Sequence, residues 1–268
     1  MLSTIADYQR ISKNINRALT TTAKKPDVSR DTAYYLAHIG KVTSVDDFLK
    51  DYRLFSYAMK AYGLSDMTYA KAFMRKVLTE GTLTSKSFAN TLTDHRFADF
   101  ANAFNFAALG SAATQTNAAQ SGTTSKYIQG VMEEDAGSQN EGVRLALYFT
   151  RQASSIKGPF SILSDKALTQ VVQTALGLPP TTSAENIDTQ AATLSKLIKF
   201  SDFQDPAKVN KFAQRFAAMW DATQDPSNPA NISSPASIAQ ILIGNSTQNT
   251  LGIGIDTLTT LQTLRFGR

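Results

Sequence analysis

The side chains that could support chemistry are few and widely spaced along the chain. His38 and His95 are the only histidines, and neither has further His, Asp or Glu residues at the spacing that places several metal ligands on one face. His38 follows Tyr34 by one helical turn, and His95 lies between Asp94 and Arg96 where a helix is expected to begin. We therefore interpret both histidines as structural and predict no metal site.

Two runs of carboxylates are the remaining candidates for acid–base chemistry. Asp46 and Asp47 stand at an expected helix start, where negative charge complements the helix dipole. The run Glu133–Asp135 is interpreted as a solvated acidic turn. Either run would have to lie in a buried cleft to transfer protons. We read both as structural.

Nucleotide-binding and nucleophile motifs are also missing. The sequence Gly252-Ile-Gly254 lacks the third glycine and the βαβ context of a dinucleotide fingerprint. The chain has neither a Gly-Lys-Ser/Thr phosphate loop nor a Gly-x-Ser-x-Gly nucleophile elbow. We therefore predict no catalytic residue, no cofactor and no small-molecule substrate.

Composition excludes further classes of protein. The chain has no cysteine, which rules out disulfides, thiolate metal sites and cysteine nucleophiles. The net charge of +5 is spread out, without the long basic run expected of a nucleic-acid-binding protein. No segment reaches the ~18 apolar residues of a membrane helix, and residues 1–17 lack the apolar core of a secretory signal. We expect no membrane insertion, and either a cytoplasmic location or export without a cleaved signal.

The elements that must position these residues read as helices throughout. Apolar residues recur at three- and four-residue steps, which predicts an all-α fold packed as a helical bundle. Ser44 with Asp47 resembles a helix N-cap, and Gly63 followed by Leu64 resembles a left-handed helix C-cap. An aromatic cluster between Tyr52 and Phe106 is read mainly as core, with an exposed partner-binding face as the alternative.

The chain is expected to carry an amphipathic helix near each end. Pro26 closes the first, and Asp256 is a suitable cap for the second. Their apolar faces are the predicted partner-binding residues, namely Ile5, Tyr8, Ile15, Leu19, Leu258, Leu261 and Leu264. The predicted organisation is an N-terminal helix (1–25), a first helical repeat (26–110), a linker or loop (111–139), a second helical repeat (140–222), and a loop with the C-terminal helix (223–268).

The two repeats are related by a shift of 114 residues. The shift pairs Gly63 and Leu64 with Gly177 and Leu178, so a complete helix cap recurs. It also pairs further identical residues, which are Arg30 with Arg144, Tyr34 with Tyr148, Leu49 with Leu163, Asp51 with Asp165, Leu54 with Leu168 and Ala61 with Ala175. This pattern predicts an internal duplication.

Several stretches resemble the DUF1217 family of alphaproteobacteria. They are Asp31–Lys41 (DTAYYLAHIGK), Val45–Leu64 (VDDFLKDYRLFSYAMKAYGL), Asp66–Met74 (DMTYAKAFM), Ser87–Asn90 (SFAN) and Phe104–Phe106 (FNF). Members of that family tend to be encoded among flagellar genes. The resemblance therefore implies a non-catalytic structural or assembly protein of the bacterial flagellum or basal body, with flagellar proteins or copies of itself as partners. The alternative is a cytoplasmic helical binding module, such as a flagellar assembly chaperone or regulator.

Overall fold

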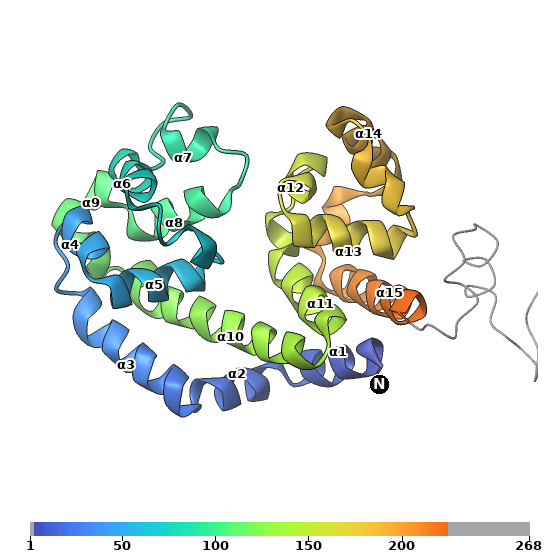
Figure 1. Cartoon of the computed structure of the whole chain (residues 1–268), viewed down its shortest axis with the longest axis horizontal. Coiled ribbons are helices and arrows are strands. Elements are labelled where there is room, and N and C mark those ends of the chain that lie inside the picture. The colour runs from blue at the N-terminus through green and yellow to red at the C-terminus, as the bar shows by residue number, and fades with distance from the viewer. Residues whose placement is uncertain (1–2, 225–268) are drawn as a thin grey trace, which may run out of the picture.

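Two helical lobes joined by one long helix make up the described part of the chain. The computed structural model describes residues 3–224, and every regular element within that range is helical, which confirms the all-α prediction (Figure 1). Each lobe has its own hydrophobic core. The predicted C-terminal helix, with Leu258, Leu261 and Leu264, lies outside the described residues.

The first lobe is built around the rings of Phe48, Phe100 and Phe104, which lie 4.7–6.2 Å apart between centroids. The Ser44 N-cap and the Gly63 C-cap bound two helices rather than one. Asp51 separates them, because its backbone is extended and its side chain accepts a hydrogen bond from the Leu54 N–H. The elements of this lobe are α3 (Pro26–Ile39), α4 (Val45–Lys50), α5 (Tyr52–Ala61), η1 (Ser65–Met67), α6 (Lys71–Glu80), α7 (Phe88–Thr91), α8 (Arg96–Phe104), α9 (Phe106–Leu109), η2 (Gly110–Gln115) and η3 (Ala118–Gly122).

The second lobe combines the later helices with the beginning of the chain. Its core includes Phe149, Val171 and Phe216, and also Tyr8. Its later elements are α11 (Glu141–Gln152), η4 (Ala153–Ser155), α12 (Pro159–Leu163), α13 (Lys166–Leu176), η5 (Pro180–Ala184), α14 (Ile187–Leu197), η6 (Phe200–Gln204) and α15 (Pro206–Gln224). The single helix predicted for residues 1–25 is two, α1 (Thr4–Lys13) and α2 (Ile15–Ala23), separated at Asn14.

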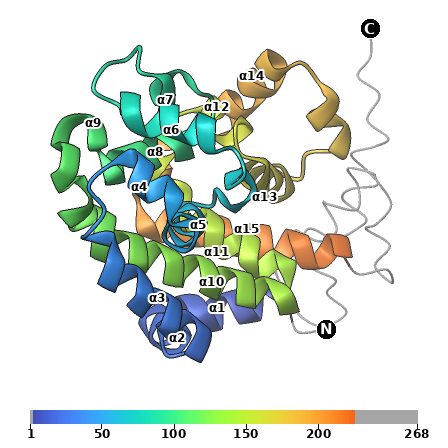
Figure 2. The ribbon, with the colours of Figure 1, turned by 60° about the vertical axis from the view of Figure 1, so that its left-hand side comes forward.

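The prediction of a linker or loop at 111–139 is wrong. Residues 123–139 form α10, which packs against α2, α5 and α11 and connects the lobes (Figure 2). Tyr127 and Val131 belong to the first core and Met132 to the second. The small polar residues that suggested a linker lie before α10. There Thr114 is buried and donates a hydrogen bond to the Val42 carbonyl, and Thr123, the first residue of α10, is buried and donates to the Ala118 carbonyl.

The acidic run Glu133–Asp135 is likewise not a solvated turn. It lies within α10, and each carboxylate pairs with a cation from a different segment. Glu133 is 5% exposed and binds Arg151 of α11 through both oxygens at 2.7 and 2.8 Å. Glu134 pairs with Lys60 of α5, and Asp135 pairs with Lys25 between α2 and α3. The run therefore ties three neighbouring elements to α10.

Several elements recur at the predicted shift of 114 residues. Helices α4 and α12 begin 114 residues apart, and so do α5 and α13. Gly63 and Gly177 both have a left-handed backbone, with φ of 70° and 67°. The following leucine N–H donates to the carbonyl five residues earlier in both caps, at 2.8 and 2.9 Å. Beyond the caps the shift no longer holds. The helix packed against α5 is α10, which begins at residue 123, and the helix packed against α13 is α15, which begins at residue 206 rather than 237. The duplication itself stays a prediction.

Two helical glycines give opposite expectations for substitution by alanine. A Cβ on Gly142 of α11 would lie 2.4 Å from Trp220 Cδ1 and 2.8 Å from Thr4 Cγ2, so Gly142→Ala should lower the free energy of unfolding by about 1–3 kcal/mol. A Cβ on Gly130 of α10 would find its nearest neighbour at 3.9 Å. Gly130→Ala should therefore raise stability by about 0.5–1 kcal/mol. Urea unfolding of the two variants measures both, and equal stabilities would contradict the close packing at Gly142.

Candidate functional site

The predicted partner-binding residues of the N-terminal helix are buried or half-buried in the structure. Tyr8 is fully buried, and its hydroxyl lies 3.0 Å from Thr150 Oγ1 and donates to Asn210 Oδ1 at 3.1 Å. Ile15 and Leu19 are half-buried against the second core, and Ile5 is half-buried. The apolar face of α1 and α2 is therefore covered by the chain's own helices. The prediction that it forms a free partner-binding face is corrected.

The start of α1 is anchored by a carboxylate that the sequence did not reveal. Asp221 of α15 accepts hydrogen bonds from Ser3 Oγ and from the Thr4 N–H, at 2.8 and 2.9 Å. These groups belong to the helix N-terminus, where backbone N–H groups have no partner within the helix. A residue more than two hundred positions away thus supplies the cap, and no local spacing could have indicated it.

The structure places the two histidines in different surroundings. The His38 ring stacks on Tyr34 with centroids 4.1 Å apart, and its Nδ1 lies 2.8 Å from the Tyr34 carbonyl oxygen. His95 is exposed at the N-terminus of α8. Within residues 3–224, no three His, Asp or Glu side chains lie close enough together to hold a metal ion. Within the same range, no helix has the length and apolar character needed to cross a membrane.

A tyrosine and an aspartate form the same contact in each lobe. Tyr34 donates to Asp51, the N-cap of α5, at 3.0 Å, and Tyr148 donates to Asp165, the N-cap of α13, at 2.5 Å. Each tyrosine ring also faces a guanidinium group, from Arg53 and Arg151 respectively. Each aspartate thus caps one helix and orients a tyrosine of an earlier helix, α3 or α11, which is a structural use of both groups.

Burial, followed by the nearby Asp165 carboxylate, raises the pKa of Tyr148 to about 12. The unfolded chain releases this proton near pH 10, so the folded state holds more protons between pH 10 and 12. The contribution of Tyr148 to stability is thus present below pH 10 and is lost as the pH rises towards 12. Tyr148→Phe should make stability fall less steeply over that range. Urea unfolding midpoints at pH 9, 10 and 11 test this, and equal slopes would contradict it.

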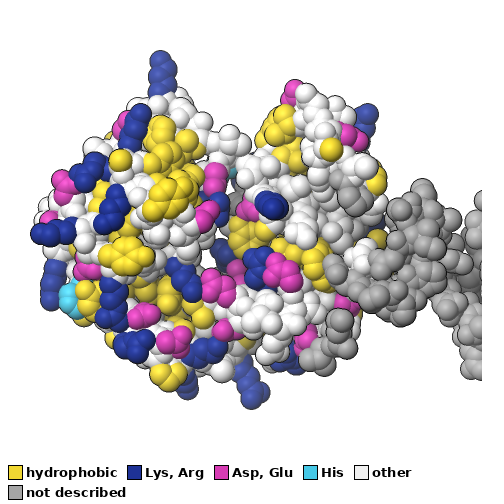
Figure 3. Space-filling view, in the orientation of Figure 1, with side chains coloured by type: hydrophobic (Ala, Val, Ile, Leu, Met, Phe, Trp, Pro, Cys, Tyr) yellow, Lys and Arg dark blue, Asp and Glu magenta, His cyan; other side chains and the backbone are white. Residues whose placement is uncertain are grey.

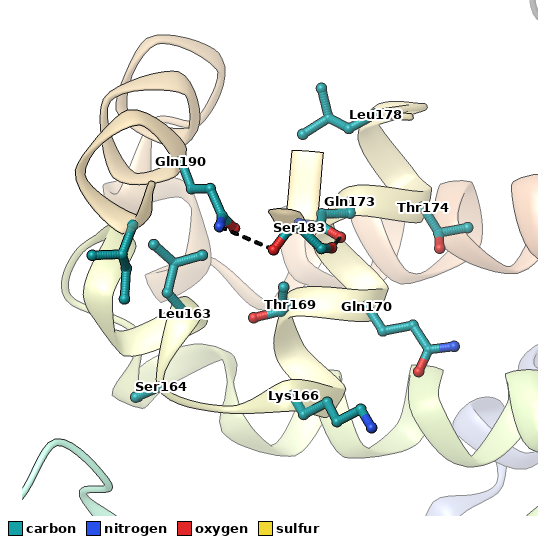
Figure 4. Close-up of a pocket in the computed structure, with 11 residues that line it drawn as sticks. Leu163, Ser164, Lys166, Thr169, Gln170, Gln173, Thr174, Leu178, Ser183 and Gln190 are labelled. Atoms are coloured by element: carbon teal, nitrogen blue, oxygen red, sulfur yellow. Dashed lines mark hydrogen bonds between the residues drawn. The ribbon is translucent and has the colours of Figure 1, made fainter. Parts of the chain in front are cut away.

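A pocket of about 750 Å³ lies in the second lobe. Figure 4 shows that α12 and α14 form one wall and α13 the other. Ser183 lies between them, donating to Gln173 and accepting from Gln190. The lining is uncharged except for Lys166, and it comprises Leu163, Ser164, Lys166, Thr169, Gln170, Gln173, Thr174, Leu178, Ser183, Ile187 and Gln190.

Exposed apolar side chains occur on both lobes. Tyr52, Tyr69 and Leu83 of the first lobe are 62%, 80% and 65% exposed, and Phe160, Ile187 and Leu197 of the second are about half exposed. Figure 3 shows hydrophobic side chains on the upper part of each lobe, flanked on the first lobe by Lys and Arg. Tyr52 and Tyr69 belong to the aromatic cluster recognised in the sequence, whereas Phe55, Phe100 and Phe104 of that cluster are core.

Comparisons with known proteins place this architecture in a family. Residues 61–209, which span parts of both lobes, match the model of DUF1217, described as a protein of unknown function. The X-ray crystal structure of a protein from Agrobacterium tumefaciens, a structural-genomics target, is similar at 47% sequence identity and a TM-score of 0.78. The similarity covers 84% of this chain and 98% of that chain. No curated protein matches the chain.

Proposed function

This chain belongs to the DUF1217 family, and from that membership and its surface we propose that it is a non-catalytic protein of the bacterial flagellum that acts through protein–protein contacts. The flagellar setting is the expectation that the sequence resemblance carries. The observation that supports binding is the exposure of two aromatic side chains of the first lobe. Tyr52 and Tyr69 are mostly exposed. Large aromatic side chains are enriched at protein interfaces and often act there as anchors.

The placement of the titratable groups supports the non-catalytic part of the proposal. Glu133 and Arg151 neutralise one another in the interior, and Asp51 and Asp165 serve as helix caps. His38 stacks on a neighbouring tyrosine. These groups therefore have structural partners already.

A pull-down from flagellated cells tests the proposal directly. The full-length chain should co-purify with basal-body proteins, and replacing Tyr52, Tyr69 and Leu83 together by serine should reduce that recovery about tenfold or more. These side chains are exposed, so the fold should be retained, which circular dichroism would verify. The matched control is Leu36→Ser, which removes an exposed leucine of α3 from the same lobe. Equal recovery of the triple variant and the control would count against this surface.

The alternative is a cytoplasmic chaperone or regulator of flagellar assembly, acting through the same kind of surface. Cell fractionation separates the two roles, because a flagellar component should be recovered with the flagellum or in the exported fraction. Recovery only in the cytoplasm, bound to one unassembled flagellar protein, would favour the chaperone. Recovery with neither flagellar structures nor flagellar proteins would refute both.

A further inference from the structure

Positive charge is concentrated at the beginning of the chain, on α1 and α2. Residues 3–25 contain five Lys or Arg side chains and one carboxylate, that of Asp7, so they hold +4 of the chain's formal net charge of +5. These cations stand at intervals in the sequence rather than in a continuous run. A concentration of one sign of charge creates a local potential that attracts partners of the opposite sign.

Four of these cations lie on the exposed side of the two helices. Arg10 and Lys13 belong to α1, Arg17 belongs to α2, Lys24 is the residue at which α2 ends, and all four are exposed. The steps of 3, 4 and 7 residues between them keep side chains on one side of a helix. The other side is covered, since α1 packs against α11 and α15 and α2 packs against α10. Lys and Arg side chains project from the lower edge of the molecule, along which α1 and α2 follow one another (Figures 1 and 3). We call this surface the basic face.

The chain's own carboxylates leave the basic face unneutralised. Among the pairs formed within residues 3–224, Asp7 pairs with Arg10 and Asp135 pairs with Lys25, whereas Lys13, Arg17 and Lys24 form no ion pair. Arg10 is still 68% exposed in its pair. Residues 225–268 contain two carboxylates and two arginines, so they add no net negative charge. The excess positive charge is therefore available to another molecule.

The surroundings of the basic face favour an acidic protein over other polyanions. A membrane-surface helix places its apolar side in the lipid, but Tyr8, Ile15 and Leu19 on the apolar side of α1 and α2 pack in or against the second core. Single-stranded nucleic acid stacks its bases on aromatic side chains, and the one aromatic residue of these helices, Tyr8, is fully buried. Four cations are also fewer than the roughly six to ten phosphate contacts of a typical DNA-binding protein.

The spacing of the cations matches that of carboxylates along one side of a helix. Arg10 and Lys24 are 14 residues apart, which is about 20 Å along a helix axis. A helix with Asp or Glu at three-, four- and seven-residue steps carries those carboxylates in one row. Laid along α1 and α2, such a helix brings a carboxylate to each cation in turn.

We propose that the basic face binds a carboxylate-rich helix of another protein. The surface is separate from Tyr52, Tyr69 and Leu83 of the first lobe, so the inference adds a second contact and does not depend on the flagellar setting. Opposite charges at such a surface chiefly raise the association rate and make binding sensitive to salt. The partner is recognised by the position of its carboxylates.

Fluorescence anisotropy with the purified full-length chain tests the proposal. The probe is a fluorescein-labelled helical peptide of Ala and Gln that carries four Glu residues at the same steps, and the comparison peptide has Gln in their place. At an ionic strength of about 0.01 M, where the Debye length is about 30 Å, the chain should bind the Glu peptide about tenfold more tightly or better. At about 0.1 M the affinity should fall, because the Debye length is then about 10 Å. No preference for the Glu peptide at low ionic strength would overturn the proposal.

Charge reversal locates the binding surface. Lys13→Glu, Arg17→Glu and Lys24→Glu together should lower the affinity for the Glu peptide about tenfold or more. These residues are exposed and form no ion pair within residues 3–224, so the fold should be retained, which circular dichroism would verify. If the triple variant does not fold, replacing the same three residues by glutamine keeps the test valid. Unchanged affinity in the folded variant would overturn the proposal.

The matched control makes the same change in net charge elsewhere on the molecule. Lys86→Glu, Lys196→Glu and Lys199→Glu replace exposed lysines outside α1 and α2 and should retain most of the affinity. An equal loss in this control would show a response to net charge alone and would overturn the assignment to the basic face. Poly-dT or phosphatidylserine vesicles bound through Lys13, Arg17 and Lys24, without binding of the Glu peptide, would overturn the proposal in favour of nucleic acid or lipid.

Discussion

Replacing Glu133 by glutamine is expected to lower the free energy of unfolding by about 3–5 kcal/mol. The glutamine keeps the shape of the side chain but leaves the Arg151 guanidinium without its counter-charge in a site where Arg151 is only 17% exposed. Burying an unpaired charge costs far more than losing an exposed ion pair. Urea unfolding followed by circular dichroism measures the effect.

The neighbouring carboxylate provides the control for Glu133. Glu134→Gln removes the pairing with Lys60, but Glu134 is 56% exposed, so the expected loss is below about 1 kcal/mol. The double replacement Glu133→Leu and Arg151→Met removes both charges together and should recover most of the stability lost in Glu133→Gln. A Glu133→Gln variant no less stable than Glu134→Gln would show that the internal pair does not join α10 to α11.

Replacing Tyr8 by alanine is expected to cost about 3–5 kcal/mol of unfolding free energy, as for other large buried aromatic side chains. The ring is fully buried in the second core, and its hydroxyl bonds link α1 to α11 and α15. If α1 were instead a free partner-binding helix, the substitution would leave stability unchanged. The measurement therefore distinguishes the two roles of the N-terminal helix.

Two further tyrosine variants separate the contributions at position 8. Tyr8→Phe keeps the ring and removes only the hydroxyl, so it should cost about 1 kcal/mol. Tyr69→Ala removes a ring that is 80% exposed and should change stability by no more than about 0.5 kcal/mol. A loss for Tyr8→Ala as small as that for Tyr69→Ala would contradict the packing of α1 into the second lobe.

Local features of this fold could be predicted because nearby residues create them. Ser44 accepts a hydrogen bond from the Asp47 N–H, and Gly63 adopts the left-handed backbone. Both follow from side chains or backbone freedom within a few residues. The spacing of apolar residues likewise revealed helices, since one helix face must be buried. The 114-residue shift located matching helix caps because each cap depends only on residues close to it in the sequence.

Features that depend on distant partners could not be predicted in this way. The acidic run at 133–135 has the composition of an exposed turn, and only its cations from α5, α11 and the α2–α3 junction show that it belongs inside the fold. The small polar residues at 111–122 have the composition of a linker, and only the burial of Thr114 against the Val42 carbonyl shows that they are part of the fold. Burial is a property of the assembled helices rather than of a short stretch of sequence.

Sequence patterns alone predict that this protein is all-helical, where several of its helices begin and end, and which family it resembles. Which helix faces are free follows from the packing of the folded chain. The pattern of apolar residues on α1 and α2 fits burial against a partner protein as well as burial in the chain's own core. The contacts of Tyr8 with α11 and α15 show that this face belongs to the core. Hydrophobic patterning specifies that a face will be buried, because apolar surface leaves water wherever it can. The choice of what buries it rests on packing between residues far apart in the chain.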